Sequence, residues 1–254
     1  MKINLSINLL CTMIMMTGLS CSVPKKIEPS ADGSKSLVYK VSRLKNPGLK
    51  IDGDWNKSEW RKVKKIPINN YMGELPAFRP LVKAKMMYDD ANLYLIFRVE
   101  DRHVRIQMQK FNESVSTDAC VEFFFSPETE FPLRYFNLEI NAGGTALMAY
   151  HIDGVRKNLT EKDFESVEIA HSLPKKLDQE ISEPVTWTLE YKLPLEMLKK
   201  FSNITMPKKG VTWRANFFKT SSKSSNPHYI TWSPVNNPVP QFHLPQFFGT
   251  LIFK

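Results

Sequence analysis

Acidic, amide and aromatic side chains recur together on one side of three expected strands. In an extended segment, alternate residues point to opposite faces, so residues two apart share a face. The residues that share a face in this way are Glu122 and Phe124, then Asn137, Glu139 and Asn141, then Arg214, Asn216 and Phe218. Carboxylates and amides form directional hydrogen bonds with hydroxyl groups, and aromatic rings cover the apolar side of a sugar ring. This pattern is typical of a sugar-binding surface, although an antiparallel sheet can simply keep one face in water.

Two carboxylates on neighbouring strands could also form the acid and nucleophile of a glycoside hydrolase. That chemistry needs carboxyl groups about 5–9.5 Å apart, a separation that adjacent strands can supply. Glu122 and Glu139 alone do not predict catalysis, because paired carboxylates on a sheet more often bind a ligand or face water. The sequence contains no Gly-x-Ser-x-Gly, P-loop or dinucleotide-binding motif. We therefore expect a binding protein rather than an enzyme.

Metal and haem sites have little support in the sequence. The five histidines are scattered, with no His-x-x-x-His or Cys-x-x-Cys spacing for zinc. Met148 and His151 could ligate haem, but no haem-attachment motif accompanies them. Aspartates in turns could ligate calcium, although aspartate also forms turns without a metal. These aspartates are Asp52, Asp54, Asp89, Asp90 and Asp101. We expect no required cofactor, with structural calcium as an open alternative.

The body of the sequence is typical of antiparallel β-structure. Apolar segments bounded by turn residues predict strands at 81–88, 93–99, 121–125, 135–140, 145–151, 166–171, 186–192, 211–218, 229–232 and 250–253. Only 55–60 and 194–201 are typical of helices, and both are short. Because strands and helices do not alternate, we expect an all-β fold over residues 37–254. The expected architecture is an antiparallel β-sandwich of jelly-roll type with one or two short helices. Its core should contain Trp55, Trp60, Trp187 and Trp213.

Residues 1–20 have the features of a secretory signal peptide: one lysine, a short apolar stretch, then small residues. The apolar stretch is shorter than the roughly 20 residues that a membrane span needs. Leu19-Ser20-Cys21 resembles a bacterial lipobox, whose cysteine is lipidated, and Cys11 is a competitor that would leave a very short leader. An uncleaved anchor or a plain secreted protein is the alternative. We expect lipidation at Cys21, which would hold the protein outside the cytoplasm on a bacterial membrane.

Residues 21–36 predict a flexible tether, because they are polar and rich in Lys, Ser and Pro. The net charge of +9 becomes +8 without the leader, which holds one lysine and no acid. Much of the remaining charge falls in scattered pairs such as Lys175-Lys176 and Lys208-Lys209, so we expect no nucleic-acid partner. Cys120 lies in an apolar segment and is expected to be a buried, unpaired thiol.

Four segments occur in a distinctive order. They are Ile51-Asp52-Gly53-Asp54-Trp55, then Tyr88-Asp89-Asp90-Ala91-Asn92-Leu93-Tyr94-Leu95, then Asp118-Ala119-Cys120-Val121-Glu122-Phe123-Phe124, and last the C-terminal elements from Trp213-Arg214-Ala215-Asn216-Phe217 to Phe242-His243-Leu244-Pro245-Gln246-Phe247-Phe248-Gly249. The ordered set resembles the family 9 carbohydrate-binding modules and their stand-alone relatives. The resemblance implies a jelly-roll β-sandwich with a site for sugars, in the best-known members the ends of plant-polysaccharide chains. Some members also hold structural calcium.

The resemblance also assigns roles to single positions. A sugar-bonding acid falls on Glu122, an amide on Asn141 and a stacking aromatic on Phe242. A second platform, tryptophan in the family, would fall near Ser116, and an expected arginine is matched by Glu139. This chain therefore keeps part of the family's site and alters the rest.

Together these observations predict a non-catalytic, lipid-anchored protein that binds oligo- or polysaccharide and supports polysaccharide catabolism at the cell envelope. The residues expected to bond hydroxyl groups are Glu122, Glu139, Asn141 and Lys219, and those expected to stack on sugar are Trp232 and Phe242. The loop from Trp232 to Phe242 is the best candidate for specificity. The alternatives are a structural or partner-binding sandwich whose sugar site has decayed and, after that, an enzyme associated with glycoside hydrolysis.

Overall fold

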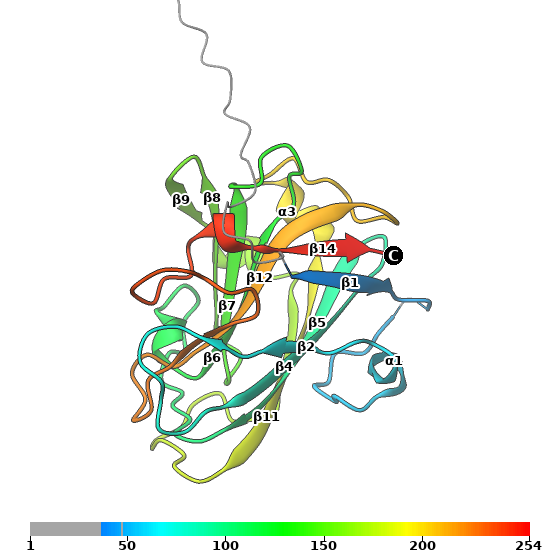
Figure 1. Cartoon of the computed structure of the whole chain (residues 1–254). Helices are drawn as coiled ribbons and strands as arrows, with labels where there is room; N and C mark the ends of the chain where they lie inside the picture. The colour runs from blue at the N-terminus through cyan, green and yellow to red at the C-terminus, as the bar shows by residue number, and fades with distance from the viewer. Residues whose placement is uncertain (1–36, 47) are drawn as a thin grey trace, which may run out of the picture. The chain divides into compact units, whose positions relative to one another are not determined.

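A computed structural model describes residues 37–46 and 48–254 (Figure 1). The predicted signal peptide, the lipidation site Cys21 and the tether lie outside the described residues. Within the described ranges, none of the helices has the length and apolar character needed to cross a membrane.

Fourteen strands of the described residues join in one pairing network. They are β1 Val38–Arg43, β2 Ile66–Ile68, β3 Asn70–Tyr71, β4 Leu81–Tyr88, β5 Asn92–Asp101, β6 Cys120–Ser126, β7 Tyr135–Asn141, β8 Ala146–Ile152, β9 Val155–Asn158, β10 Glu168–His171, β11 Val185–Pro194, β12 Thr212–Thr220, β13 Tyr229–Thr231 and β14 Gly249–Phe253. Three short helices accompany them: α1 Ser58–Arg61, α2 Glu161–Phe164 and α3 Leu195–Lys199. The predicted helices at 55–60 and 194–201 correspond to α1 and α3.

The strands form two facing layers joined by β1 (Figure 1). One layer has the order β10-β11-β5-β4, with β2 beside β4, and the other has the order β14-β12-β6-β7-β8-β9. Strand β1 pairs with β4 on one side and with β14 on the other, and both pairings are parallel. The predicted β-sandwich is confirmed, and these two parallel pairings are its departure from a purely antiparallel arrangement.

Each predicted strand is present, with ends that differ by at most two residues. The sequence missed β1, β2, β3 and β9, which are short or lack an apolar pattern. All four residues of β9 are exposed, so no hydrophobic alternation marks it. In β1, only Tyr39 and Val41 are buried, so its apolar alternation is short.

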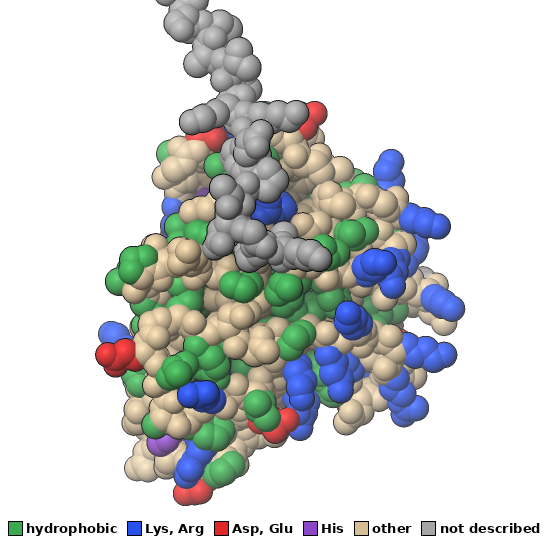
Figure 2. All heavy atoms as spheres, viewed as in Figure 1, with side chains coloured by type: hydrophobic (Ala, Val, Ile, Leu, Met, Phe, Trp, Pro, Cys, Tyr) green, Lys and Arg blue, Asp and Glu red, His purple; other side chains and the backbone are tan. Residues whose placement is uncertain are grey.

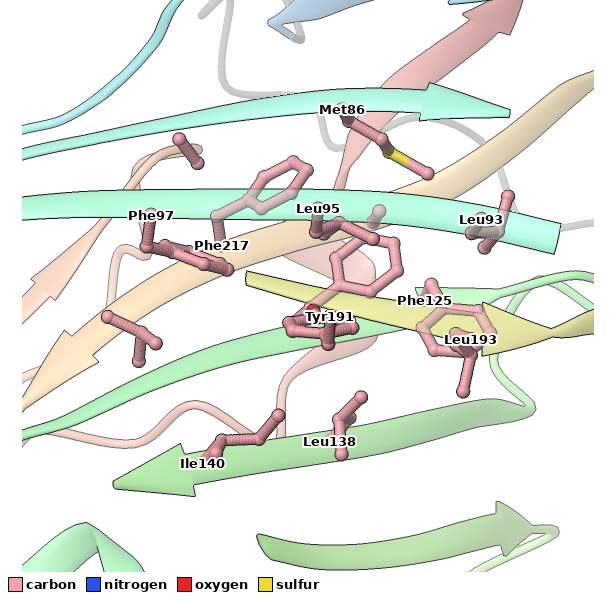
Figure 3. Packing of buried hydrophobic residues seen from close by; sticks show 14 of the residues in the cluster. Met86, Leu93, Leu95, Phe97, Phe125, Leu138, Ile140, Tyr191, Leu193 and Phe217 are labelled. Carbon is pink, nitrogen blue, oxygen red and sulfur yellow. The ribbon is translucent and has the colours of Figure 1, made fainter. Parts of the chain in front are cut away.

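The core between the layers consists mainly of aromatic and branched aliphatic side chains (Figure 3). Phe97 of β5 and Phe217 of β12 meet across the two layers with ring centroids 6.4 Å apart. The four tryptophans expected in the core are buried: Trp187 and Trp213 in the main core, and Trp55 and Trp60 in a smaller cluster beside α1. Cys120 is buried and unpaired as predicted, and burial raises the pKa of its thiol.

The outer face of β6, β7 and β12 is covered rather than exposed to water. Phe124 and Phe218 are buried on this face, and Phe242 stacks on Phe218 with centroids 4.2 Å apart. The covering segment, residues 232–248, is held to β12 by Asn216, whose Nδ2 donates to the Ser233 carbonyl (3.0 Å) and whose Oδ1 accepts from the Ser233 amide (2.8 Å). The alternative of a simply solvated face is wrong, because an aromatic loop packs against it.

Lysine and arginine side chains gather on one side of the surface in Figure 2, over the region where Figure 1 shows β1 and α1. Folding therefore places basic side chains more densely on this side than on the rest of the face in view. The covering segment 232–248 lies away from that side in Figure 1.

Candidate functional site

A pocket of about 290 Å³ opens where the covering segment meets the outer face of β6 and β7. Ligand sites occupy roughly 300–1,000 Å³, so this pocket suits a small group such as one sugar ring. It is lined by Ser116, Glu122, Phe124, Glu139, Thr220, Ser222, Tyr229, Pro240, Gln241, Phe242 and His243. The wall thus combines carboxyl, hydroxyl and amide groups with three aromatic rings.

Glu122 and Glu139 lie directly opposite each other on β6 and β7. Glu122 is only 2% exposed, and its Oε1 has no hydrogen-bond partner among the described residues. The Oε1 atom of Glu139 accepts a 2.9 Å bond from Asn137 Nδ2. A buried oxygen that lacks a donor is unfavourable unless a ligand or solvent supplies one. Glu122 is therefore ready to accept a hydrogen bond from something in the pocket.

The carboxyl pair has unusual acidity. Burial raises the pKa of Glu139 to about 7, and burial together with the charge of Glu139 raises the pKa of Glu122 well above its ordinary value. Carboxylates that face each other out of water cannot both ionise easily, so such a pair titrates as a unit. Near neutral pH the pair can therefore offer both a donor, from a protonated carboxyl, and acceptors.

Aromatic and imidazole rings form a rigid frame around the carboxyl pair. His151 stacks on Tyr135 at 4.5 Å, and its Nε2 donates to Asn137 Oδ1 (2.9 Å), the amide that bonds Glu139. His243 lies 4.9 Å from the ring of Phe124, and its Nδ1 is 2.9 Å from the Tyr135 hydroxyl. Burial lowers the pKa of both histidines to about 4, so they are neutral at physiological pH. The two imidazoles therefore hold Asn137 and Tyr135 in place without adding charge to the pocket.

Three of the residues singled out in the sequence come together here: Glu122, Glu139 and Phe242 all line the pocket. Ser116, the position matched to a second aromatic platform, lines it too. Sequence reasoning missed Thr220 and Ser222, although they continue the alternation of Phe218 beyond the predicted end of its strand. It also missed Tyr229, which begins β13, whereas Pro240 and Gln241 belong to the loop from Trp232 to Phe242 that the sequence singled out for specificity.

Asn141 does not line the pocket. Its Nδ2 donates to Asp118 Oδ2 and to the Met108 carbonyl, both at 2.9 Å, and its Oδ1 accepts from the amides of Gly143 (3.2 Å) and Thr145 (2.9 Å). The side chain is fully buried. Although Asn141 shares a face with Glu139, it lies at the end of β7, where it holds the following turn.

Lys219 lies on the other face of β12, between the layers, with no exposed surface. Its Nζ donates to His228 Nε2 (2.7 Å) and to the Thr220 carbonyl (3.0 Å), and it is 3.3 Å from Asp101 Oδ2. The placement of Lys219 at the sugar surface does not hold in this structure, because its neighbour Phe218, and not Lys219, faces outward.

Trp232 is only 4% exposed, and its ring packs edge-to-face on Phe217 with centroids 5.5 Å apart. The expectation of an exposed ring at a loop rim is wrong. Asn70 Nδ2 donates to the Trp232 carbonyl at 2.5 Å, and Gly249 leaves room for the ring. A side chain at Gly249 would place its Cβ 2.6 Å from the Trp232 ring.

The aspartates considered for calcium are engaged elsewhere. Asp52 pairs with Lys57 (2.8 Å), Asp90 with Arg43, and Asp101 with Lys219. Asp54 accepts from the Asn56 amide, and Asp89 accepts from the amides of the turn that follows it. In residues 37–46 and 48–254, no three acidic, histidine or cysteine side chains cluster closely enough to hold a metal ion. Structural calcium stays a prediction.

Comparison with known proteins places this geometry in a family. The family model described as "Carbohydrate-binding family 9" matches residues 50–253. The chain belongs to carbohydrate-binding family 9. Modules of carbohydrate-binding family 9 are non-catalytic binding modules. A search of curated protein sequences finds no match.

Solved structures show the same fold. A presumed carbohydrate-binding protein from Bacteroides uniformis ATCC 8492 is 26% identical, with a TM-score of 0.78 over 87% of this chain and 100% of that chain. Two structures of a family 9 module from Caldicellulosiruptor kristjanssonii are each 16% identical. The complex with cellotriose has a TM-score of 0.59 and covers 86% of this chain and 94% of that chain. The complex with glucose has a TM-score of 0.58 and covers 86% and 96%. At this identity, the two complexes support the fold alone.

Proposed function

We propose that the pocket beside Glu122 and Glu139 binds one sugar residue of an oligo- or polysaccharide, without cleaving it. The observation that carries this proposal is that residues predicted separately from the sequence lie together in one pocket. Glu122, Glu139 and Phe242 were predicted from sequence as sugar-site residues, and all three line one pocket, beside the Ser116 position where the family has a second aromatic platform. The chain's membership of carbohydrate-binding family 9 supports the same conclusion.

The pocket supplies the interactions that a sugar ring needs. The unpartnered Oε1 of Glu122 would accept a bond from a sugar hydroxyl, and the carboxyl of Glu139 would bond a neighbouring one. Phe242, held in place by its stack on Phe218, would cover an apolar face of the ring. Gln241 and Ser222 stand at the pocket wall as further polar groups.

Calorimetric titration against a panel of soluble oligosaccharides, including cello-oligosaccharides, tests this proposal. Glu122→Gln keeps the size of the side chain but replaces the carboxyl with an amide that cannot ionise, so it should weaken binding at least about tenfold. Glu196→Gln is a matched control, because Glu196 lies in α3 with a side chain 82% exposed and paired only with Lys199. The control should bind like the wild type.

Three outcomes would contradict the proposal. Absence of binding to every glycan would favour a partner-binding sandwich, whereas release of reducing sugar from a bound oligosaccharide would favour an enzyme. Equal binding by wild type and Glu122→Gln would place the site elsewhere on the protein.

For location, we propose that Cys21 carries a lipid anchor that holds the protein outside the cytoplasm, where it captures polysaccharide for breakdown. The lipobox-like Leu19-Ser20-Cys21 and the apolar segment before it support this proposal. Palmitate labelling in a bacterial host should mark the wild type and spare Cys21→Ala, and globomycin should block maturation of the wild type. Unlabelled wild-type protein would rule out the anchor.

A further inference from the structure

The pocket wall has an unbalanced charge. It holds two carboxyl groups, and among the described residues that line it there is neither a lysine nor an arginine. The remaining wall groups are hydroxyls, an amide, a proline and aromatic rings, together with His243, which is neutral near pH 7. Any ionisation of the carboxyl pair therefore creates negative charge in the pocket with no cation beside it.

Two cations attract this pair without pairing with it. Lys219 attracts Glu122, but it lies on the opposite face of β12 and is engaged by Asp101 at 3.3 Å. Arg156 attracts Glu139 from β9, but it is exposed, and its Nε donates to Asn158 Oδ1. Exposed charges are screened by water and salt. A positively charged group on the ligand itself would therefore balance the ionised carboxyl pair best.

We propose that this pocket selects sugars that carry a free amino group, bound as an ammonium between Glu122 and Glu139, over neutral sugars and uronic acids. The inference rests on the proposed function of the pocket and specifies its ligand class. An ammonium donates three hydrogen bonds, and Glu122 offers a buried acceptor without a partner. Charge-assisted bonds of this kind are about twice as strong as neutral ones. A uronic acid would bring a third carboxylate to the pair and be repelled.

Binding of an ammonium must also change the protonation of the pocket. In the free protein the pair retains protons near neutral pH, because burial and mutual repulsion favour the uncharged form. A bound cation favours the charged form, so the pair releases a proton to the buffer as the ligand enters. A neutral sugar brings no charge and should release no such proton. Proton release therefore distinguishes an ion pair in the pocket from a better fit of shape.

The experiment compares the methyl glycosides of glucose, glucosamine and glucuronic acid by calorimetry near pH 7. At this pH, amines of the α-amino class, with pKa values of about 7.7–8.0, are largely protonated. Titrations in two buffers of different ionisation enthalpy measure the protons released. We expect the amino sugar to bind about tenfold more tightly than glucose, with proton release, and the uronic acid to bind more weakly than glucose.

Glu139→Gln should remove the preference for the amino sugar and its proton release, because the amide cannot ionise beside an ammonium. Glu196→Gln, which removes the same charge far from the pocket, should leave the preference intact. If glucose binds as well as the amino sugar, or the uronic acid binds as well as glucose, the inference is overturned while the proposed function stands. If the wild type binds none of these sugars or their oligomers, the proposed function fails.

Discussion

Lys219 and Asp101 form a buried ion pair that joins the two layers of the sandwich. The Nζ of Lys219, on β12, lies 3.3 Å from Asp101 Oδ2, on β5, and both side chains are almost fully buried. Lys219 also donates to His228, whose Nδ1 donates to the Asn226 carbonyl at 2.7 Å. Removing either partner of a buried pair leaves an uncompensated charge in a region without water.

Lys219→Met should therefore destabilise the fold by about 3–5 kcal/mol, whereas the affinity of the folded protein for sugar should change little. Urea unfolding measures the first effect, and calorimetry below the unfolding transition measures the second. Lys219→Met combined with Asp101→Leu should recover part of the stability, because neither charge is then left alone. If the Lys219→Met protein had normal stability but no longer bound sugar, Lys219 would be a sugar-binding residue and this prediction would be wrong.

Gly249→Ala should lower the free energy of unfolding by about 1–3 kcal/mol. The added Cβ would lie 2.6 Å from the Trp232 ring and 2.9 Å from the Leu37 carbonyl, both closer than atoms can approach. Thermal unfolding checks this prediction. Gly154→Ala is a useful comparison, because Gly154 has nothing within 4 Å of the added atom and only its positive φ of 84° opposes the change. Equal stability of Gly249→Ala and wild type would mean that Trp232 can move.

Phe242→Ala should weaken sugar binding about two- to tenfold, since it removes a ring from the pocket wall. Phe242→Tyr keeps the stacking face and should retain most of the affinity. Calorimetric titration of both variants tests this pair of expectations. If both variants bind like the wild type, the ring does not contact the ligand.

Glu139 links stability to pH. Burial raises its pKa from 4.5 to about 7, so the folded state holds this proton more tightly than the unfolded state does. The resulting stability is present below about pH 4.5 and is lost as the pH rises through about 7. His151 and His243 act in the opposite sense, because their pKa values fall from 6.5 to about 4. Their contribution is present above about pH 6.5 and is lost as the pH falls through about 4.

Glu139→Gln should therefore gain stability relative to wild type as the pH rises from about 5 to about 7, by about 1–3 kcal/mol. The charged and titratable groups facing Glu139 are Glu122 on β6, His151 on β8, Arg156 on β9 and His243 in the covering segment. Because the pKa of Glu122 stays raised, the free energy of unfolding of the variant should still fall somewhat as the pH rises. Urea midpoints across this range measure the difference, and parallel pH curves would disprove the linkage.

The strands were predictable from sequence because most of them alternate or are continuously apolar. Strand β4 has the bounds that its alternation predicts, Leu81–Tyr88. Strand β9 could not be found, because it is held by backbone bonds to β8 and buries no side chain. The parallel pairings of β1 were also beyond reach, since strand order depends on contacts between segments far apart in the sequence.

Within the site, strand parity brought Glu122 and Glu139 to one face, and the family resemblance added Phe242. Strand parity could not show that the side chain of Asn141 is already hydrogen-bonded to Asp118 and to the Thr145 amide in the turn after β7. Trp232 was misplaced for a related reason: its flanking prolines and asparagines are typical of an exposed loop, whereas the loop folds back onto β12. What a loop covers depends on tertiary contacts that its own sequence does not encode.

The position of β1 has a mechanical consequence. A force applied to the chain before Leu37 would act first on β1, which is hydrogen-bonded to β14 on one side and to β4 on the other. The Leu37 carbonyl already accepts a 2.8 Å bond from the Thr250 amide, so β14 resists from the first residue of that stretch. Withdrawal of β1 would separate the two layers along their seam. Tension would therefore be met by the backbone hydrogen bonds of three adjacent strands, while the pocket, on β6 and β7, stays outside the path of the force.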